Sequence, residues 1–188
     1  MPTTNYHFIT NWKVKAQKSE IAAIMNEPLT LPLWWPAVYL EIETEETDDE
    51  TFYHLHTKGW LPYTIRWSFQ RTVDQLPDYL ELKAIGDLEG YGKWTFTQEG
   101  EFVNIHYDWE VVGNKPIFKY LAFILRPLFG FNHRWAMDRG LESLKLELER
   151  RRKGLNFGEG KRPPLAAFPH RHFYQENLNR FLSGTNEK

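Results

Sequence analysis

The sequence predicts an α+β domain in which a curled antiparallel sheet of seven strands wraps around one long helix near the C-terminus. Two observations lead to this prediction. From about 39 to 112, apolar and polar residues alternate with a period of two, and short turns separate the segments, as in antiparallel strands joined by hairpins. Beyond this region the apolar residues recur three or four apart, as in a helix that buries one face.

The N-terminal part of the chain predicts one strand and two short helical pieces. A strand is expected at 6–15, where aromatic and aliphatic residues alternate with polar or small ones. A short helix is expected at 17–25 and a second helical turn at 29–35. The first is followed by Pro28 and the second by Pro36, and a proline disfavours helical backbone in the residue before it.

Six further strands follow, separated by acidic, proline-containing or glycine-containing breaks. In the third of them Ile65, Trp67 and Phe69 face one way, while the intervening polar residues face the other. An antiparallel sheet that is covered on one face has this pattern. The six strands are expected at 39–47, 51–60, 63–73, 79–88, 90–99 and 102–112.

A long helix is expected from about 115 to 153, interrupted at Arg126–Pro127 and Gly130. Because this helix is the only large apolar element left, it must cover the apolar face of the sheet, and a curled sheet around a helix encloses a cavity unless side chains fill it. The basic end of the helix, 150–153, is interpreted as a C-terminus that stabilises the helix dipole, not as a nucleic-acid patch. The buried stripe consists of His133, Met137, Leu141, Leu144 and Leu148.

The composition argues against several classes of protein. With 23 Lys and Arg against 25 Asp and Glu, the formal net charge of −2 argues against nucleic acid as a partner. The absence of Cys removes disulfides, thiolate nucleophiles and Cys-based metal sites. No apolar run reaches the length of about 20 residues that a membrane span needs, and the N-terminus lacks the features of a signal peptide. We expect a cytoplasmic protein with no stable membrane insertion, no metal and no cofactor.

The chain divides into a domain at 1–153 and a C-terminal tail at 154–188. The tail is too apolar for a solvated linker, and one short amphipathic helix is expected within it. We expect the tail to pack on its own domain or on a second subunit, which would make a homodimer. The apolar residues of that helix are Tyr174, Leu178, Phe181 and Leu182.

Four strings, distributed within residues 5–152, carry a resemblance to a known family. They are GWLPYTIRW at 59–67, GDLEGYGKW at 86–94, YDW at 107–109 and NHRWAM at 132–137. In these strings and in its order of elements, the chain resembles the polyketide cyclase/dehydrase and lipid-transport family of the START-related, birch-pollen-allergen-like superfamily (SRPBCC). The resemblance implies a helix-grip fold with a hydrophobic pocket between sheet and helix. It also implies binding of lipids, sterols, polyketides or plant hormones, with catalysis in only some members.

Aromatic residues make up 16% of the chain, and those on the apolar face of the sheet are candidates for the pocket wall. Core packing alone would explain the same residues. With two residues from the helix, the candidate ligand-binding residues are Trp60, Tyr63, Trp67, Phe69, Trp94, Phe96, Tyr107, Trp109, His133 and Met137.

His133 is the candidate with two roles to distinguish, because it lies on the buried helix stripe. It is either a core histidine that is hydrogen-bonded to the sheet or a pocket residue that donates to a ligand or transfers a proton. We expect a hydrogen-bonded ring that still borders the cavity.

Other motifs carry less weight. The glycines of 86–93 lack the spacing of a phosphate-binding loop and are expected to form a hairpin turn and a sheet bend. His54 and His56 share a strand face but have no third ligand nearby, so they are expected to be surface residues, and a metal at His170 and His172 is favoured even less. Arg66 and Arg71 are candidate anchors for an acidic ligand.

Three functions remain open. The first is a carrier for a small hydrophobic or aromatic ligand, which requires an apolar cavity with few titratable groups. The second is a cofactor-free cyclase or dehydratase that moves protons with His133 and Tyr63 or Tyr107, which requires polar groups converging in the cavity. The third is an interaction module that uses the tail, which requires a filled cavity and an exposed apolar patch.

Overall fold

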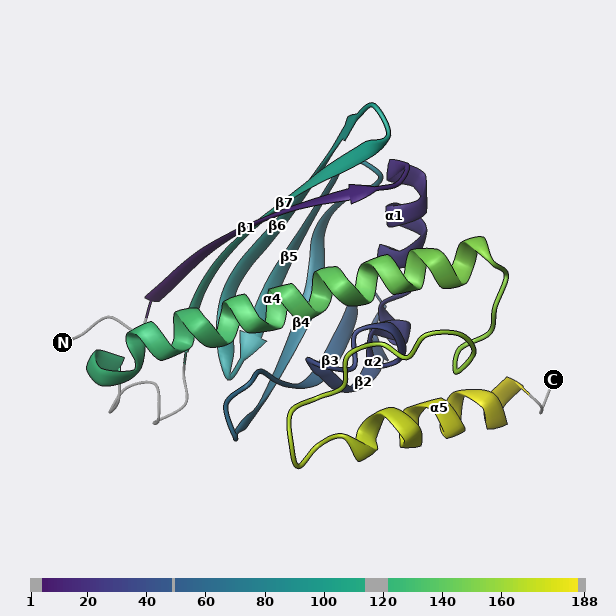
Figure 1. Cartoon of the computed structure of the whole chain (residues 1–188). Coiled ribbons are helices and arrows are strands. Elements are labelled where there is room, and N and C mark those ends of the chain that lie inside the picture. The colour runs from purple at the N-terminus through teal and green to yellow at the C-terminus, as the bar shows by residue number, and fades with distance from the viewer. Residues whose placement is uncertain (1–4, 49, 114–121, 186–188) are drawn as a thin grey trace.

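The computed structural model describes residues 5–48, 50–113 and 122–185. Its strands form one antiparallel sheet that curls around a long helix (Figure 1). In chain order they are β1 (Asn5–Lys15), β2 (Tyr39–Glu46), β3 (Thr51–Lys58), β4 (Thr64–Gln75), β5 (Tyr79–Gly86), β6 (Leu88–Glu99) and β7 (Phe102–Gly113). The order across the sheet is β1-β7-β6-β5-β4-β3-β2, so the first strand of the chain pairs with the last.

The alternation predicted from the sequence explains which face of the sheet is buried. Along β7, every second residue from Val103 to Val111 is buried, and the residues between them are half-buried or exposed. Antiparallel pairing with β1 on one side and β6 on the other keeps these side chains on the concave face. The α+β class, the seven strands and the curled sheet around a helix are confirmed.

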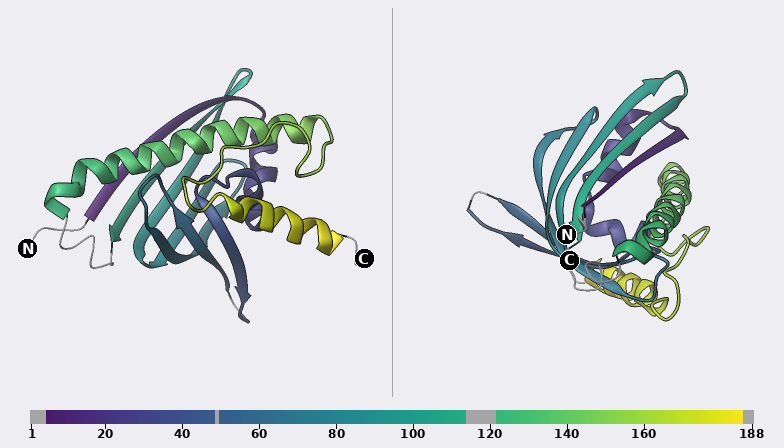
Figure 2. Two further views of the ribbon diagram at one scale, coloured as in Figure 1. Left: turned by 60° about the horizontal axis from the view of Figure 1, so that its bottom comes forward. Right: turned by 90° about the vertical axis from the view of Figure 1, so that its left-hand side faces the viewer.

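The helices lie on the concave side of the sheet or at its β2 edge (Figure 2). They are α1 (Lys18–Met25), the 3-10 turn η1 (Pro28–Thr30), α2 (Leu31–Trp34), α4 (Ala122–Arg152) and α5 (His172–Thr185). No helix in the described ranges is long and apolar enough to cross a membrane.

Helix α4 corrects one prediction. It runs without a break from Ala122 through Pro127 and Gly130, so the expected interruption is wrong. Pro127 lies in the second turn, where the loss of one backbone hydrogen bond near a helix end is offset by burial of the stripe further along. The expected start at 115 lies outside the described residues.

The basic end of α4 is bound to carboxylates. Buried Glu147 accepts from Nε of Arg150 at 2.7 Å and Nε of Arg151 at 2.6 Å, and Arg152 pairs with Glu20 of α1 at 2.7 Å. Arg151 also reaches Glu27, which precedes η1, at 2.7 Å. These ion pairs join the end of α4 to the segment after β1.

The tail packs on its own chain. Helix α5 contacts α2 and β2, and Tyr174 and Leu178 form a small buried cluster with Leu33. The side-chain amide of Asn177 donates to the backbone oxygen of Leu40 at 2.6 Å. Lys58 is buried at the end of β3, and its ammonium donates to the backbone oxygen of Ala167, a tail residue that precedes α5, at 3.0 Å. The tail is therefore part of the folded unit.

Candidate functional site

Two adjoining cavities lie inside the curled sheet. The wide cavity has a volume of about 160 Å³ and lies between the sheet and the first half of α4. The narrow cavity has about 70 Å³ and extends beneath α1 and α2. The two cavities share five wall residues, which define the junction between them: Trp35, Tyr39, Trp67, Trp94 and Tyr107.

Nine of the ten candidate ligand-binding residues line these cavities. Three of the nine belong to the junction, namely Trp67, Trp94 and Tyr107. The wide cavity adds Tyr63, Trp109, His133 and Met137, and the narrow cavity adds Phe69 and Phe96.

Trp60 is the exception. It lines neither cavity, its side chain is 49% exposed, and its ring meets Phe131 edge-on with 5.5 Å between the centroids. Since β3 ends at Lys58, the period-two argument does not extend to Trp60. Its predicted place in the pocket wall is wrong.

The wall is built from aromatic rings that lie in contact across several strands. Tyr107 lies on Trp94 with 3.8 Å between centroids and 15° between planes, and Trp109 lies 5.7 Å from Trp67. Gly92 allows this arrangement, because a Cβ on it would lie 2.8 Å from the ring of Trp109 and 3.0 Å from the hydroxyl of Tyr107. The cavity wall is therefore aromatic across the centre of the sheet.

His133 is both hydrogen-bonded to the sheet and exposed to the cavity. Its Nε2 lies 3.3 Å from Oγ1 of Thr10 on β1, and its ring stacks on Phe8 at 4.2 Å. The same ring borders the wide cavity. Burial lowers the pKa of His133 to about 4, so the imidazole is neutral at pH 7.

Several polar groups near the wide cavity are already engaged with the protein. Asn132 accepts a hydrogen bond from the backbone N–H of Leu61 at 3.0 Å. Thr57 accepts one from the indole N–H of Trp67 at 2.9 Å. Burial raises the pKa of Tyr63, so its hydroxyl stays protonated. The cavity is thus mainly apolar, with few free polar groups.

Many wall residues of the wide cavity were not among the candidates; three of the aromatic ones are Phe8, Trp35 and Tyr39. Phe8 belongs to the predicted first strand, and its place in the alternation could have identified it. Trp35 and Tyr39 lie where α2 leads into β2, and no periodic pattern covers that short connection. The density of aromatic residues between 34 and 39 is the one signal that could have marked it.

The histidines of β3 have partners other than a metal. His54 lies between Oγ of Ser68 at 2.7 Å and Oε2 of Glu45 at 2.9 Å. His56 contacts Oε2 of Glu41 at 2.9 Å and is buried beside Phe173 of α5. The expectation that both are surface residues is therefore wrong for His56, because the tail covers it.

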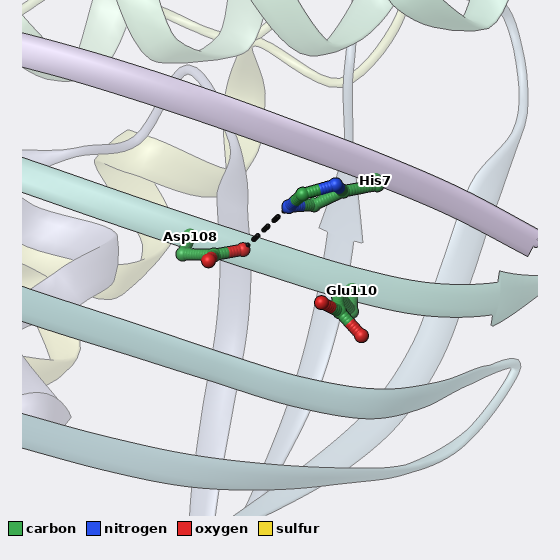
Figure 3. A group of neighbouring side chains, drawn as sticks. All are labelled: His7, Asp108 and Glu110. Carbon is green, nitrogen blue, oxygen red and sulfur yellow. Dashed lines mark hydrogen bonds and ion pairs between the residues drawn. The ribbon is translucent and has the colours of Figure 1, made fainter.

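A different group of metal-ligating residues lies on the outer face of the sheet, away from α4 (Figure 3). It consists of His7 on β1 with Asp108 and Glu110 on β7, whose ligand atoms lie within 4.8 Å of one another. His7 and Asp108 already pair at 2.8 Å. The cross-strand register of β1 and β7 explains the group as a surface ion pair.

The two arginine candidates face away from the wide cavity or are occupied. Arg66 is exposed on the outer face, 4.0 Å from Glu41. Arg71 borders the narrow cavity, but its guanidinium pairs with Asp74 at 2.6 Å and donates to the backbone oxygen of Met25 at 2.5 Å. Arg71 thus ties the end of α1 to the sheet.

Comparison with known proteins places this geometry among solved folds. No family model matches the chain, and no curated protein matches it in sequence. Among solved structures, the Zhui aromatase/cyclase from Streptomyces sp. R1128 has a TM-score of 0.65 at 15% identity, covering 84% of this chain and 99% of its own. A START superfamily protein from Mycobacterium smegmatis has a TM-score of 0.60 at 11% identity, covering 77% and 98%.

A plant enzyme has the same architecture. Norcoclaurine synthase from Thalictrum has a TM-score of 0.51 at 17% identity, covering 79% of this chain and 99% of its own. At these identities the likeness concerns the fold. This chain therefore has the helix-grip fold of the START-related, SRPBCC-type proteins.

Proposed function

We propose that this protein binds a small hydrophobic or aromatic molecule in the two adjoining cavities between the sheet and α4. The observation that carries the proposal is the aromatic junction, where five rings from the connection after α2, from β2 and from three other strands of the sheet line open space. Ligand sites of this kind are mostly apolar, with a few placed polar groups.

The hydrogen bonds of the polar side chains near the wide cavity support binding over catalysis. Asn132 and Thr57 accept hydrogen bonds from other residues of the protein, and His133 is hydrogen-bonded to Thr10. General acid–base catalysis works best with a pKa near the operating pH, and a pKa of about 4 leaves His133 a weak base at pH 7.

A cyclase or dehydratase is the second candidate. It is supported by the presence of His133, Tyr63 and Tyr107 in one cavity and by the Zhui aromatase/cyclase among the similar folds. Under this alternative, His133→Gln would abolish turnover of a polyketide-like substrate without loss of binding.

We propose that the protein acts in the cytoplasm, on the basis of its composition. A chain without Cys is suited to a reducing compartment such as the cytoplasm. Because the tail packs on its own domain, the proposal needs no second subunit.

Ligand binding can be tested with a panel of fatty acids and polycyclic aromatic compounds. Since Trp35, Trp67, Trp94 and Trp109 line the cavities, binding should change the tryptophan emission and raise the melting temperature. Native mass spectrometry of the purified protein would show any ligand that copurifies.

A matched pair of variants tests the location. Ala136 of α4 borders the wide cavity, whereas Arg134 on the same helix is exposed. Ala136→Phe should fill the cavity and abolish binding, while Arg134→Phe should bind as the wild type does. Unchanged emission and melting temperature with the whole panel at high micromolar concentration would contradict the proposal.

A further inference from the structure

Two tyrosine hydroxyls belong to the junction of the cavities. Tyr39 begins β2, at one edge of the sheet, and Tyr107 lies in β7, next to the opposite edge. The curl of the sheet brings their side chains to the walls of the same two cavities. The ring of Tyr107 is fixed on Trp94, and that of Tyr39 meets Trp35 edge-on, with 5.2 Å between centroids.

Neither hydroxyl has a hydrogen-bond partner within the described ranges of the chain, in contrast to Asn132, Thr57 and His133. Neither oxygen is completely enclosed by protein atoms. A buried hydroxyl that has no partner and is not completely enclosed borders open space, and here that space is the cavity. An unpaired buried polar group costs free energy. A ligand that accepts hydrogen bonds from these two hydroxyls therefore gains the most binding free energy.

The environment also determines the chemical state of the pair. Burial is the largest cause that raises the pKa of each phenol, and the proximity of Tyr39 adds to the effect at Tyr107. Both groups therefore remain neutral O–H donors over the physiological range. Both side chains line both cavities, so the two phenols border the same junction.

We propose that the hydroxyls of Tyr39 and Tyr107 form a polar subsite that binds the carbonyl oxygen of a flat, apolar ligand extending into both cavities. This inference rests on the proposed function and specifies its ligand class. A carbonyl oxygen has two acceptor lone pairs and can accept from both phenols. The rings of Trp94, Trp67 and Trp35 suit a planar body on either side of that oxygen.

The subsite selects a neutral oxygen. No Lys or Arg is among the five junction residues, and the two that line the cavities are engaged with the protein. Arg71 of the narrow cavity pairs with Asp74, and Lys58 of the wide cavity donates to the backbone oxygens of Ala167 and Phe168. A carboxylate would lose its hydration there without a countercharge, which costs more than two neutral hydrogen bonds return. A ketone carries no such penalty.

The test uses two planar probes of nearly equal shape, 9-fluorenone and fluorene, which differ by the carbonyl oxygen. Their affinities are measured by calorimetry for the wild type, Tyr39→Phe, Tyr107→Phe and the double variant. Each substitution keeps the ring and removes only an unpartnered hydroxyl, so the unliganded variants should be as stable as the wild type. The control is Tyr91→Phe, a residue on β6 that is 48% exposed and lines neither cavity.

Each single variant should bind 9-fluorenone roughly 5–10-fold more weakly, as the loss of one hydrogen bond predicts, and fluorene with less than about a twofold change. The carbonyl stretching band of bound 9-fluorenone should lie at lower wavenumber in the wild type than in the double variant. Tyr91→Phe should change neither value.

The outcomes separate the two proposals. If the wild type binds both probes but the tyrosine variants weaken neither or both equally, or if one tyrosine alone matters, the subsite is wrong and the binding function stands. If the wild type binds neither probe and nothing in the wider panel, both proposals are overturned.

Discussion

The imidazole of His133 on α4 lies flat against the ring of Phe8 on β1, with 4.2 Å between the ring centroids and 11° between the planes. This contact, together with the hydrogen bond to Thr10, joins the long helix to the first strand at the wall of the wide cavity. It also keeps the imidazole away from water, which is why its pKa falls to about 4.

The stability of the protein should therefore depend on pH through His133. In the unfolded chain a histidine has a pKa near 6.5, so as the pH falls the unfolded state takes up the proton first. Stability should be lost between about pH 6.5 and pH 4, by about 2–3 kcal/mol from this group, and should change no further through His133 below that range. His133→Gln keeps a polar group near Thr10 but does not titrate.

Urea unfolding at pH 7 and pH 4.5 checks this expectation. The difference in unfolding free energy between the two pH values should be smaller for His133→Gln than for the wild type. His106→Gln, at an exposed position on the outer face, should keep the wild-type difference. An equal pH dependence in all three proteins would show that His133 is not a buried neutral group.

The second prediction concerns two glycines of α4. A Cβ on Gly140 would lie 2.2 Å from the indole of Trp35, whereas a Cβ on Gly130 would meet nothing within 4 Å. Gly130→Ala should stabilise the protein by about 0.5–1 kcal/mol, because alanine favours helix more than glycine does. Gly140→Ala should destabilise it, since Trp35 must move.

Because Trp35 belongs to the cavity junction, Gly140→Ala should also weaken ligand binding and change the near-ultraviolet circular dichroism. Gly130→Ala should leave both unchanged. Thermal unfolding and a titration with one ligand of the panel measure the two effects. If Gly140→Ala were as stable as Gly130→Ala and bound equally well, the close approach of Trp35 to α4 would be wrong.

Much of this fold could be predicted because the alternation of apolar and polar residues indicates directly which face of a strand is buried. In β4, Trp67 and Phe69 lie on the apolar face of the strand, and they line the cavities in the structure. The same reasoning failed at Trp60, two residues beyond the end of β3, because alternation does not determine the direction of a side chain outside a strand.

The junction of the cavities was only partly predictable for a different reason. Tyr39 and Tyr107 lie 68 positions apart in the chain, and the curl of the sheet, which depends on every strand pair between them, brings them together. Local periodicity carries no information about that curl. Likewise, the cover that α5 places over His56 depends on the path of the tail, which has no periodic pattern.

The third prediction concerns the carboxylate at the end of α4. Glu147 is 3% exposed and accepts from both Arg150 and Arg151. Glu147→Gln leaves the partly buried guanidinium of Arg150 without its charge partner and Arg151 with Glu27 as its remaining carboxylate, so it should lower the free energy of unfolding by about 2–4 kcal/mol. Glu142→Gln, which removes an exposed pair with Arg139 on the same helix, should cost less than about 1 kcal/mol. Equal losses in urea unfolding would contradict the buried role of Glu147.

The last prediction concerns the tail, which covers Leu33 of α2 through Tyr174 and Leu178. Leu178 is 8% exposed and Leu182, one turn later in α5, is 41% exposed. Leu178→Ala should therefore cost about 2–4 kcal/mol and Leu182→Ala less than about 1 kcal/mol. Removal of 155–188 should lower the melting temperature further, because it uncovers Leu33 and leaves the ammonium of Lys58 without the backbone oxygen of Ala167.

Truncation should also alter the wall of the narrow cavity. Helix α2 contacts both α5 and α4, and Trp34 and Trp35 at its end line the narrow cavity. Loss of the tail should loosen these two rings and weaken the fluorescence response to a bound ligand, whereas Leu182→Ala should not. A truncated protein with the melting temperature and binding of the full chain would show that the tail contributes nothing to the site, and the stabilising contacts between α5 and α2 would have to be abandoned.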